Sequence, residues 1–173
     1  FLRMQHDNLM PVVRDVDALG GAKSRHQLMD EISAGIRDAN GTSSKLNALN
    51  AFKDREMFRI DMRHIQGVIT GLRQFSAELS DLAEVVVCAA YELCWSELQA
   101  HHGQPLLENG KPCSLSVCAL GKLGGRELGF ASDIELLFVY AGNGKTSGAE
   151  MISTPEFYEH FVRNFVETIH AKR

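Results

Sequence analysis

The stretch "GKLGGRELGFASDIELLFVY" (121–140) is the part of this sequence from which fold and function are best predicted. Adjacent glycines are followed by a short polar piece, and the apolar run "IELLFVY" (134–140) is then predicted to form a strand. The alternating run "SLSVCAL" (114–120) predicts another strand just before the glycines. Asp133 and Glu135 need an explanation, because strands that enter a core rarely begin with two carboxylates.

The glycine pair predicts a phosphate-binding turn. Gly124 and Gly125 precede "RELGF" (126–130), which is expected to form a short helical turn. Without a Cβ, glycine lets backbone N–H groups approach an anion, and the start of a helix adds donors and a positive dipole end. Lys122 and Arg126 add positive charge. Taken alone, however, two glycines before a helix are more often ordinary turn chemistry.

The two carboxylates predict a metal site next to this turn. In a strand, residues two apart point to the same face, so Asp133 and Glu135 are expected side by side while Ile134 and Leu136 face the core. Like charges this close repel unless a cation lies between them, and Mg²⁺ commonly binds carboxylates together with substrate phosphates. The acids are therefore predicted to hold Mg²⁺ and the glycines to hold phosphate. The alternative is a solvated edge strand with two exposed acids.

The composition indicates a globular chain and disfavours several classes of protein. The 173 residues are 45% hydrophobic, which is enough for a packed core. A net charge of −4 argues against a nucleic-acid partner, and no apolar run is long enough to cross a bilayer. The cysteines, at 88, 94, 113 and 118, form no C-x-x-C pair, so a zinc site is not expected. Scattered cysteines without a secretory signal indicate a cytoplasmic protein. No membrane partner is expected, since no apolar run reaches the length of a bilayer.

The fold class predicted from hydrophobic periodicity is a mostly helical α+β fold with a short sheet. A helical segment is expected over 1–105 and a mixed α/β part over 106–173. Within the helical segment, helices are predicted after Ser24 as N-cap, from residue 45 to Gly67, and over 76–101 with Ser76 as N-cap. A final helix is predicted from residue 154, with Thr154 as N-cap.

Two groups of residues are predicted to have structural roles. The charged segment Lys53, Asp54, Arg55 and Glu56 is expected to lie mostly on a solvated helix face. Tyr91 and Trp95 are expected to pack in the core or between domains, because no basic cluster accompanies them for base stacking.

The segment "GNGKT" (142–146) ends like a phosphate-binding P-loop. The complete P-loop pattern requires glycine at position 139, where this sequence has Val139. No helix follows Thr146 directly, since a loop and Pro155 come next. Residues 141–150 are therefore predicted to form a flexible loop.

In this sequence the pair "GG" is followed by seven residues and then by "DIEL". This spacing resembles the signature of the nucleotidyltransferase superfamily, which has the DNA polymerase β-like fold. More closely, the stretch "LGKLGGRELGFASDIELLFVY" (120–140) resembles the glutamine synthetase adenylyltransferase family. Similarity to the helical segment of that family is seen in "FKDREMFRIDMRHIQG" (52–67) and "ELSDLAE" (78–84). The resemblance covers residues 45–173 and implies that 106–173 is the N-terminal part of a nucleotidyltransferase domain.

The resemblance also implies an activity and the residues that perform it. The activity is Mg²⁺-dependent transfer of AMP from ATP to a tyrosine of glutamine synthetase, or phosphorolytic removal of that AMP, in control of nitrogen assimilation. Asp133 and Glu135 would be the catalytic metal ligands. The implied nucleotide-binding residues are Gly124, Gly125, Lys122, Arg126 and Ser132. Glutamine synthetase, ATP and a PII-type signal protein are the implied partners, and the sequence leaves open whether this is the adenylylating or the deadenylylating half.

Two departures from the family pattern leave other interpretations open. The second acid is Glu135 where the family usually has aspartate, and a third carboxylate, expected in a segment like D-x-R-L-R-P, is absent before Arg173. The chain, which starts at Phe1, is therefore expected to be a fragment that folds but is inactive alone. One alternative is a nucleotide-sensing or regulatory module without turnover. Another is a helical interaction domain with an incidental glycine turn.

Overall fold

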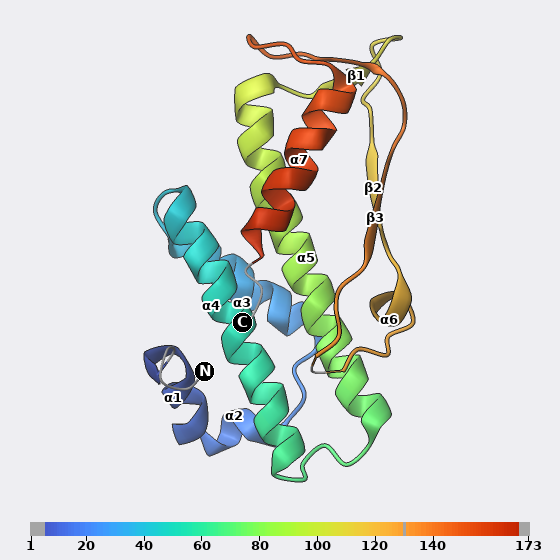
Figure 1. Ribbon diagram of the computed structural model, residues 1–173. Helices are drawn as coiled ribbons and strands as arrows, with labels where there is room; N and C mark the ends of the chain where they lie inside the picture. The colour runs from blue at the N-terminus through green and yellow to red at the C-terminus, as the bar shows by residue number, and fades with distance from the viewer. Residues whose placement is uncertain (1–5, 130, 170–173) are drawn as a thin grey trace. The chain divides into compact units, whose positions relative to one another are not determined.

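The computed structural model describes residues 6–129 and 131–169 (Figure 1). Helices predominate and are accompanied by short antiparallel strand pairs, which confirms the predicted mostly helical α+β fold. In chain order the elements are α1 (His6–Arg14), α2 (Val16–Gly20), α3 (Arg25–Asp38), α4 (Thr42–Ile65), α5 (Leu72–His102), β1 (Pro105–Leu107), β2 (Leu115–Ala119), α6 (Gly121–Gly124), β3 (Leu136–Tyr140), β4 (Gly144–Thr146) and α7 (Thr154–Thr168). None of the described helices is both long and apolar enough to cross a bilayer.

The described residues divide into two compact units. The first contains residues up to Ala89 together with Gly121–Ile134, and the second contains Ala90–Leu120 together with the residues from Glu135 onward. Helix α5 continues from the first unit into the second. The glycine-rich segment therefore groups with the N-terminal helices, and the domain boundary near residue 105 stays a prediction.

Helix packing defines the first unit, in which α4 lies against α1, α2 and α3. Helix α3 begins as predicted after Ser24, whose hydroxyl accepts a hydrogen bond from the backbone N–H of Gln27. The Gln27 side chain accepts in return from the Ser24 N–H, which completes a capping box. The apolar core comprises Leu9, Val12, Leu19, Leu28, Ile32, Leu49, Phe52, Ile60, Ile69, Phe75, Leu79, Leu82, Val85, Val86, Leu123 and Leu128. Burial of these side chains is the main favourable term in the stability of the unit.

Helix α5 begins at Leu72, so the predicted start at Ser76 is wrong. Ser76 is buried inside the helix, and its carbonyl accepts a hydrogen bond from the Ser80 hydroxyl. Serine favours helix N-termini, but the helical turn before it buries Phe75, and this packing outweighs the local preference of serine. The helix ends, as predicted, just before Gly103, which has a φ of 74°.

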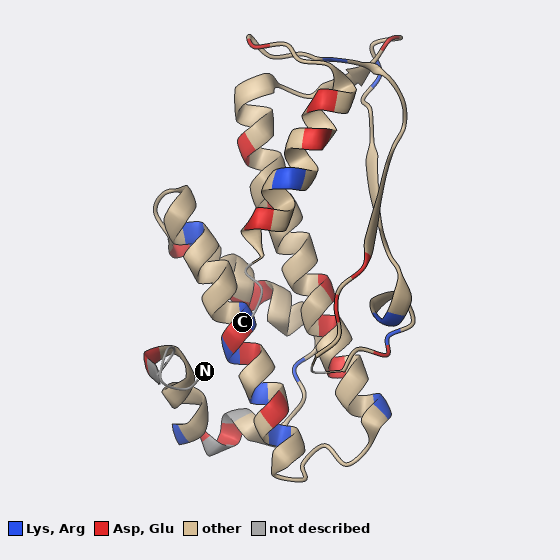
Figure 2. Cartoon of the chain, viewed as in Figure 1, with Lys and Arg blue, Asp and Glu red and all other residues tan. Residues whose placement is uncertain are grey.

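The charged segment of α4 is buried, so its predicted position on a solvated face is wrong for most of its residues. Lys53, Asp54 and Glu56 are at most 8% exposed, whereas Arg55 is half-buried. Charges of both signs lie along this helix (Figure 2). Burying such groups is tolerated only where opposite charges and hydrogen bonds compensate the lost hydration.

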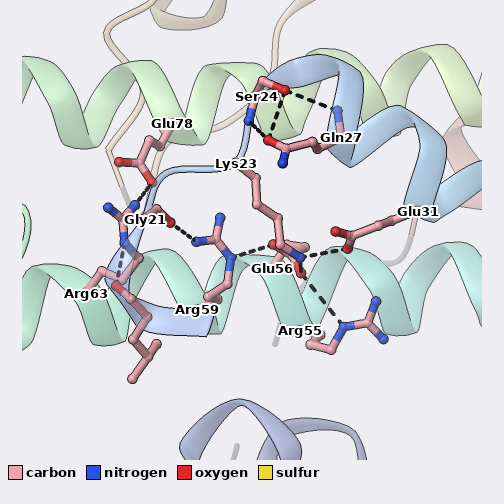
Figure 3. Close-up of polar contacts among 11 residues, drawn as sticks. Gly21, Lys23, Ser24, Gln27, Glu31, Arg55, Glu56, Arg59, Arg63 and Glu78 are labelled. Atoms are coloured by element: carbon pink, nitrogen blue, oxygen red, sulfur yellow. Dashed lines mark hydrogen bonds and ion pairs between the residues drawn. The ribbon is translucent and has the colours of Figure 1, made fainter. Parts of the chain in front are cut away.

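Glu56 is the centre of a buried group of ions, here called the Glu56 network (Figure 3). Its carboxylate accepts from Arg59 Nε at 2.7 Å and from Lys23 Nζ at 2.9 Å. Arg59 also donates to the carbonyl of Gly21 at 3.2 Å, and Lys23 also donates to Glu31 at 2.6 Å. Burial raises the pKa of Glu56, but the hydrogen bonds from Lys23 and Arg59 outweigh this effect and leave the pKa lowered.

A second buried ion pair connects α4 with α5 inside the first unit (Figure 3). Arg63 donates a charge-assisted hydrogen bond to Glu78, and both side chains are at most 8% exposed. The Nε atom of Arg63 donates to the carbonyl of Leu19 at 3.0 Å. Arg63 therefore ties α4 to α5 and to α2 through a single planar group.

Helix α7 lies beside the end of α5 in the second unit (Figure 1), and aromatic side chains pack between the two helices. The ring centroid of Trp95 lies 5.6 Å from that of Phe157 and 6.1 Å from that of Phe161. The Tyr91 ring meets the Phe161 ring edge-on at 5.1 Å. These contacts confirm the prediction that Tyr91 and Trp95 are packing residues.

Helix α7 begins at Thr154, but its N-cap is Ser153 and not the predicted Thr154. The Ser153 hydroxyl accepts a hydrogen bond from the N–H of Glu156 at 3.3 Å. Thr154 is fully buried and donates instead to the carbonyl of Leu106 at 3.3 Å. The Ser153 hydroxyl thus caps the helix, whereas the Thr154 hydroxyl attaches the helix to β1.

The P-loop-like triplet "GKT" is strand β4, so the prediction of a loop is wrong for these residues. Strand β4 pairs antiparallel with β1, and β2 pairs antiparallel with β3. A Cβ atom added to Gly144 would lie 1.9 Å from the carbonyl oxygen of Leu106. The close approach of two strands therefore accounts for this glycine.

Candidate functional site

The glycine-rich segment folds differently from the prediction. Helix α6 contains Gly124 and precedes Gly125, whereas residues 126–129 of the predicted turn "RELGF" are not helical; Phe130 lies outside the described residues. The backbone N–H groups of residues 125, 126 and 127 donate to the carbonyls of residues 121, 123 and 122, at 3.0, 3.0 and 2.7 Å. These three donors are used within the segment, so they do not form the predicted array of free donors after the glycine pair.

Buried leucines hold this segment in place. Leu123 in α6 and Leu128 after the turn are at most 5% exposed and belong to the core of the first unit. Between them Arg126 adopts a left-handed backbone with a φ of 56°. Gly125 does not lie in the left-handed region, and a Cβ added there would meet its nearest heavy atom at 3.5 Å. The fold itself therefore does not require glycine at position 125.

The predicted phosphate-binding cations have different surroundings. Lys122 is exposed on α6. Arg126 instead donates to Asp81 at 2.9 Å and to Glu84 at 3.1 Å, both on α5. Glu84 also accepts from Arg25 at the start of α3. The hydrogen bond with Asp81 raises the pKa of Arg126.

Ser132 organises the turn that leads to the acids. Its hydroxyl accepts from the N–H of Gly129 at 2.9 Å, and its own N–H donates to the Gly129 carbonyl at 3.1 Å. A hydroxyl that accepts a hydrogen bond still carries its own hydrogen, which can donate to a phosphate oxygen. Ser132 is thus placed by backbone contacts directly before Asp133.

The two acids lie just before a strand and not within it. Strand β3 begins at Leu136, and the carbonyl of Glu135 accepts from the N–H of Leu120 at 2.9 Å. Both acids precede the regular strand, so strand alternation does not determine how their side chains are directed. Ile134, predicted to face the core, is 42% exposed, because the regular strand starts after it.

Both acids are available for a ligand. Asp133 and Glu135 are exposed, and neither carboxylate forms a hydrogen bond or ion pair with any described residue. Carboxylate oxygens are the donors that Mg²⁺ prefers, and the ion typically takes one or two of them together with phosphate and water. The donor set therefore fits Mg²⁺. Among the described residues there is no cluster of three or more His, Cys, Asp or Glu that could hold a metal by itself.

Sequence reasoning missed the residues on α5 that hold Arg126. No partner was predicted for Asp81 or Glu84, although their spacing of three places them on one face of the helix. Their partners Arg25 and Arg126 are separated from them by 42 or more positions in the sequence. Hydrophobic periodicity describes only residues within one helix or strand, so it cannot predict ion pairs between residues this far apart in the sequence.

Comparisons with known proteins agree with one another. A family model described as glutamate-ammonia ligase adenylyltransferase matches residues 2–172. The chain is 35% identical over 132 residues to the bifunctional glutamine synthetase adenylyltransferase/adenylyl-removing enzyme of Thioalkalivibrio sulfidiphilus, covering 76% of this chain and 14% of that protein. Proteins of the same name from Acinetobacter baylyi (30% identity) and Aromatoleum aromaticum (35% identity) match 82% and 76% of this chain. The chain spans 14–15% of the length of these three relatives.

Proposed function

This chain belongs to the glutamate-ammonia ligase adenylyltransferase family, and we propose that its protein transfers AMP from ATP to a tyrosine of glutamine synthetase or removes that AMP by phosphorolysis. The observation that carries the proposal is the family match over residues 2–172. The named relatives are described as both adenylyltransferase and adenylyl-removing enzymes, so both directions of the reaction are proposed and both are assayed. A cytoplasmic location and regulation by a PII-type signal protein are parts of the same proposal.

We propose separate roles for the two acids and for the glycine-rich segment. Asp133 and Glu135 hold Mg²⁺, which when bound neutralises the phosphate charge that develops during transfer. The triphosphate is bound by the glycine-rich segment, with Gly124, Gly125, Lys122 and Ser132 as its contacts. The exposure of both acids and the turn made by Ser132 support this assignment. Positioning and charge are the main contributions that phosphoryl chemistry requires from a protein.

The test uses the complete natural protein with glutamine synthetase, MgCl₂ and ATP labelled at the α-phosphate. Adenylyl transfer is expected to label a tyrosine of glutamine synthetase, and a Tyr→Phe variant of the target should remain unlabelled. For the reverse direction, adenylylated glutamine synthetase and inorganic phosphate should release ADP. Absence of both reactions with an intact target would contradict the proposed activity.

A nucleotide-sensing module without turnover is the second candidate. It is favoured by the internal use of the N–H groups at residues 125–127, which leaves fewer backbone donors for a phosphate group. Such a module would bind ATP in the presence of Mg²⁺ but would neither label glutamine synthetase nor release ADP. Calorimetric titration with a non-hydrolysable ATP analogue, run beside the transfer assay, separates the two candidates.

Replacing Gly125 by alanine is expected to reduce activity without affecting the fold. The added Cβ meets its nearest heavy atom at 3.5 Å, an ordinary contact, and the backbone is not left-handed. If nucleotide phosphate approaches this backbone, however, the methyl group obstructs it. We expect the KM for ATP to rise about tenfold, equivalent to about 1.4 kcal/mol, with an unchanged unfolding midpoint.

The matched control for this substitution is Gly35→Ala in α3. A Cβ at Gly35 meets nothing within 4 Å, and alanine favours the helix, so the variant should have wild-type kinetics. If Gly125→Ala also has wild-type kinetics, the phosphate does not bind against residue 125.

A further inference from the structure

Arg126 lies in a small group of opposite charges in the first unit, here called the α5 ion cluster: Arg25, Asp81, Glu84 and Arg126. Arg126 donates through separate nitrogen atoms to Asp81 at 2.9 Å and to Glu84 at 3.1 Å. Glu84 also pairs with Arg25. The side chain of Arg126 is 44% exposed, so solvent weakens each pair, but two partners fix the direction of the guanidinium group.

The backbone of the same residue is in an unfavourable conformation. Arg126 is the only non-glycine residue among those described with a positive φ, at 56°. A left-handed backbone is unfavourable for a residue with a Cβ, because that atom comes too close to the following carbonyl oxygen. Its N–H donates to Leu123, and its side chain is attached to α5, so backbone and side chain together hold the conformation.

This turn determines the path of the chain toward the acids. The segment leaves α6 at Gly124, turns at Arg126, buries Leu128 and reaches Asp133 after the Ser132 turn. A guanidinium that is occupied by two carboxylates has little remaining capacity to neutralise a phosphate. The observations thus favour a role in fixing the loop over direct contact with the nucleotide.

We propose that Arg126 is a positioning residue for adenylyl transfer, which acts through Asp81 and Glu84 to hold the glycine-rich segment and thereby Asp133. This inference rests on the proposed function. It replaces the role expected from the sequence, in which Arg126 would contact the nucleotide directly. Arg126 affects the reaction through the left-handed turn, and the α5 carboxylates are as important for that turn as Arg126 itself.

The test compares four variants of the complete natural protein: Arg126→Ala, Arg126→Gly, Arg126→Lys and the double variant Asp81→Asn/Glu84→Gln. Arg126→Ala and the double variant should each lower kcat about tenfold, with less than a threefold change in the KM for ATP. Combining them should lower kcat no further, because both remove the same contact. Arg126→Lys should recover part of the rate, since lysine keeps the charge but not the two-pronged geometry.

Arg126→Gly provides a result that direct phosphate binding would not produce. Glycine adopts the left-handed turn without the penalty of a Cβ, so this variant should be more active than Arg126→Ala although both lack the guanidinium. The exposed arginine Arg163 on α7 serves as control, and Arg163→Ala should have wild-type kinetics. A large rise in the KM for ATP in Arg126→Ala, with wild-type kinetics in the double variant, would overturn the proposal.

Hydrogen exchange separates failure of this inference from failure of the proposed function. Loss of the α5 ion cluster should speed amide exchange at residues 125–127, whose N–H groups are bonded within the segment. If the wild-type protein lacks adenylyl transfer but exchange accelerates in Arg126→Ala and in the double variant, only the proposed activity fails. If exchange and kinetics both stay at wild-type values in these variants, the positioning role is wrong.

Discussion

Replacing Asp133 by asparagine in the complete natural protein is expected to lower adenylyl transfer or removal to below about a tenth of the wild-type rate, a loss of more than about 1.4 kcal/mol of transition-state stabilisation. Asparagine keeps the shape of the side chain but removes the negative charge that binds Mg²⁺. Asp133 is exposed and has no partner among the described residues, so the fold does not depend on its charge. The unfolding midpoint should therefore stay unchanged while the initial rate falls.

A matched control distinguishes metal binding from a general effect of charge. Glu159 is an exposed acid on α7, and Glu159→Gln should have wild-type kinetics. Glu135→Gln should resemble Asp133→Asn, and both variants should need more MgCl₂ to reach half of their maximal rate. If Asp133→Asn keeps more than about a tenth of the wild-type rate, equivalent to about 1.4 kcal/mol, this carboxylate is not an essential metal ligand.

Glu56→Gln is expected to cause the largest loss of stability, about 3–5 kcal/mol in the free energy of unfolding. Glu56 and Arg59 are 1% and 2% exposed, and their atoms Oε2 and Nε are 2.7 Å apart. Removing the carboxylate charge leaves the Arg59 guanidinium buried without its counter-charge. The control is Glu31→Gln: Glu31 binds the same Lys23 but its side chain is 40% exposed, so its loss should cost less than about 1 kcal/mol.

The effect of Glu56 should also depend on pH. Its pKa is lowered in the folded protein, so the carboxylate contributes its full stabilisation above its ordinary pKa of about 4.3. That contribution is lost as the pH falls through the lowered pKa of the folded state. Urea titrations of wild type and Glu56→Gln should differ most near neutral pH and converge in acid. A constant difference down to pH 3 would contradict the assignment.

Local signals in the sequence predicted much of the secondary structure. Tertiary packing explains the helix and strand boundaries that were predicted wrongly. The cap at Ser24 and the end of α5 before Gly103 depend on residues that are neighbours in the sequence. A local sequence pattern is therefore sufficient to predict both helix ends. The start of α5 depends instead on the burial of Phe75, which made Ser76 an interior residue. Local patterns cannot show such burial because the partners are distant in sequence.

Charged residues illustrate the same limit more strongly. A run such as Lys53–Glu56 usually lies on a solvated face, and nothing local shows that Lys23, far earlier in the chain, binds Glu56. At the candidate site, the glycines and acids were recognisable from their spacing. The ion partners of Arg126 on α5 and the exact start of β3 were not, because both depend on how separate segments meet.

The Glu56 network also restricts how this protein can change over generations. A lineage that replaces Glu56 first leaves a buried guanidinium without its counter-charge. One that replaces Arg59 first leaves a buried carboxylate with only Lys23 and the more distant Arg55 as counter-charges. Either order passes through a poorly folded intermediate genotype, although an apolar pair of similar volume could be as stable as the ions. Selection therefore acts on the two positions jointly, and descendants should inherit or exchange them as a pair.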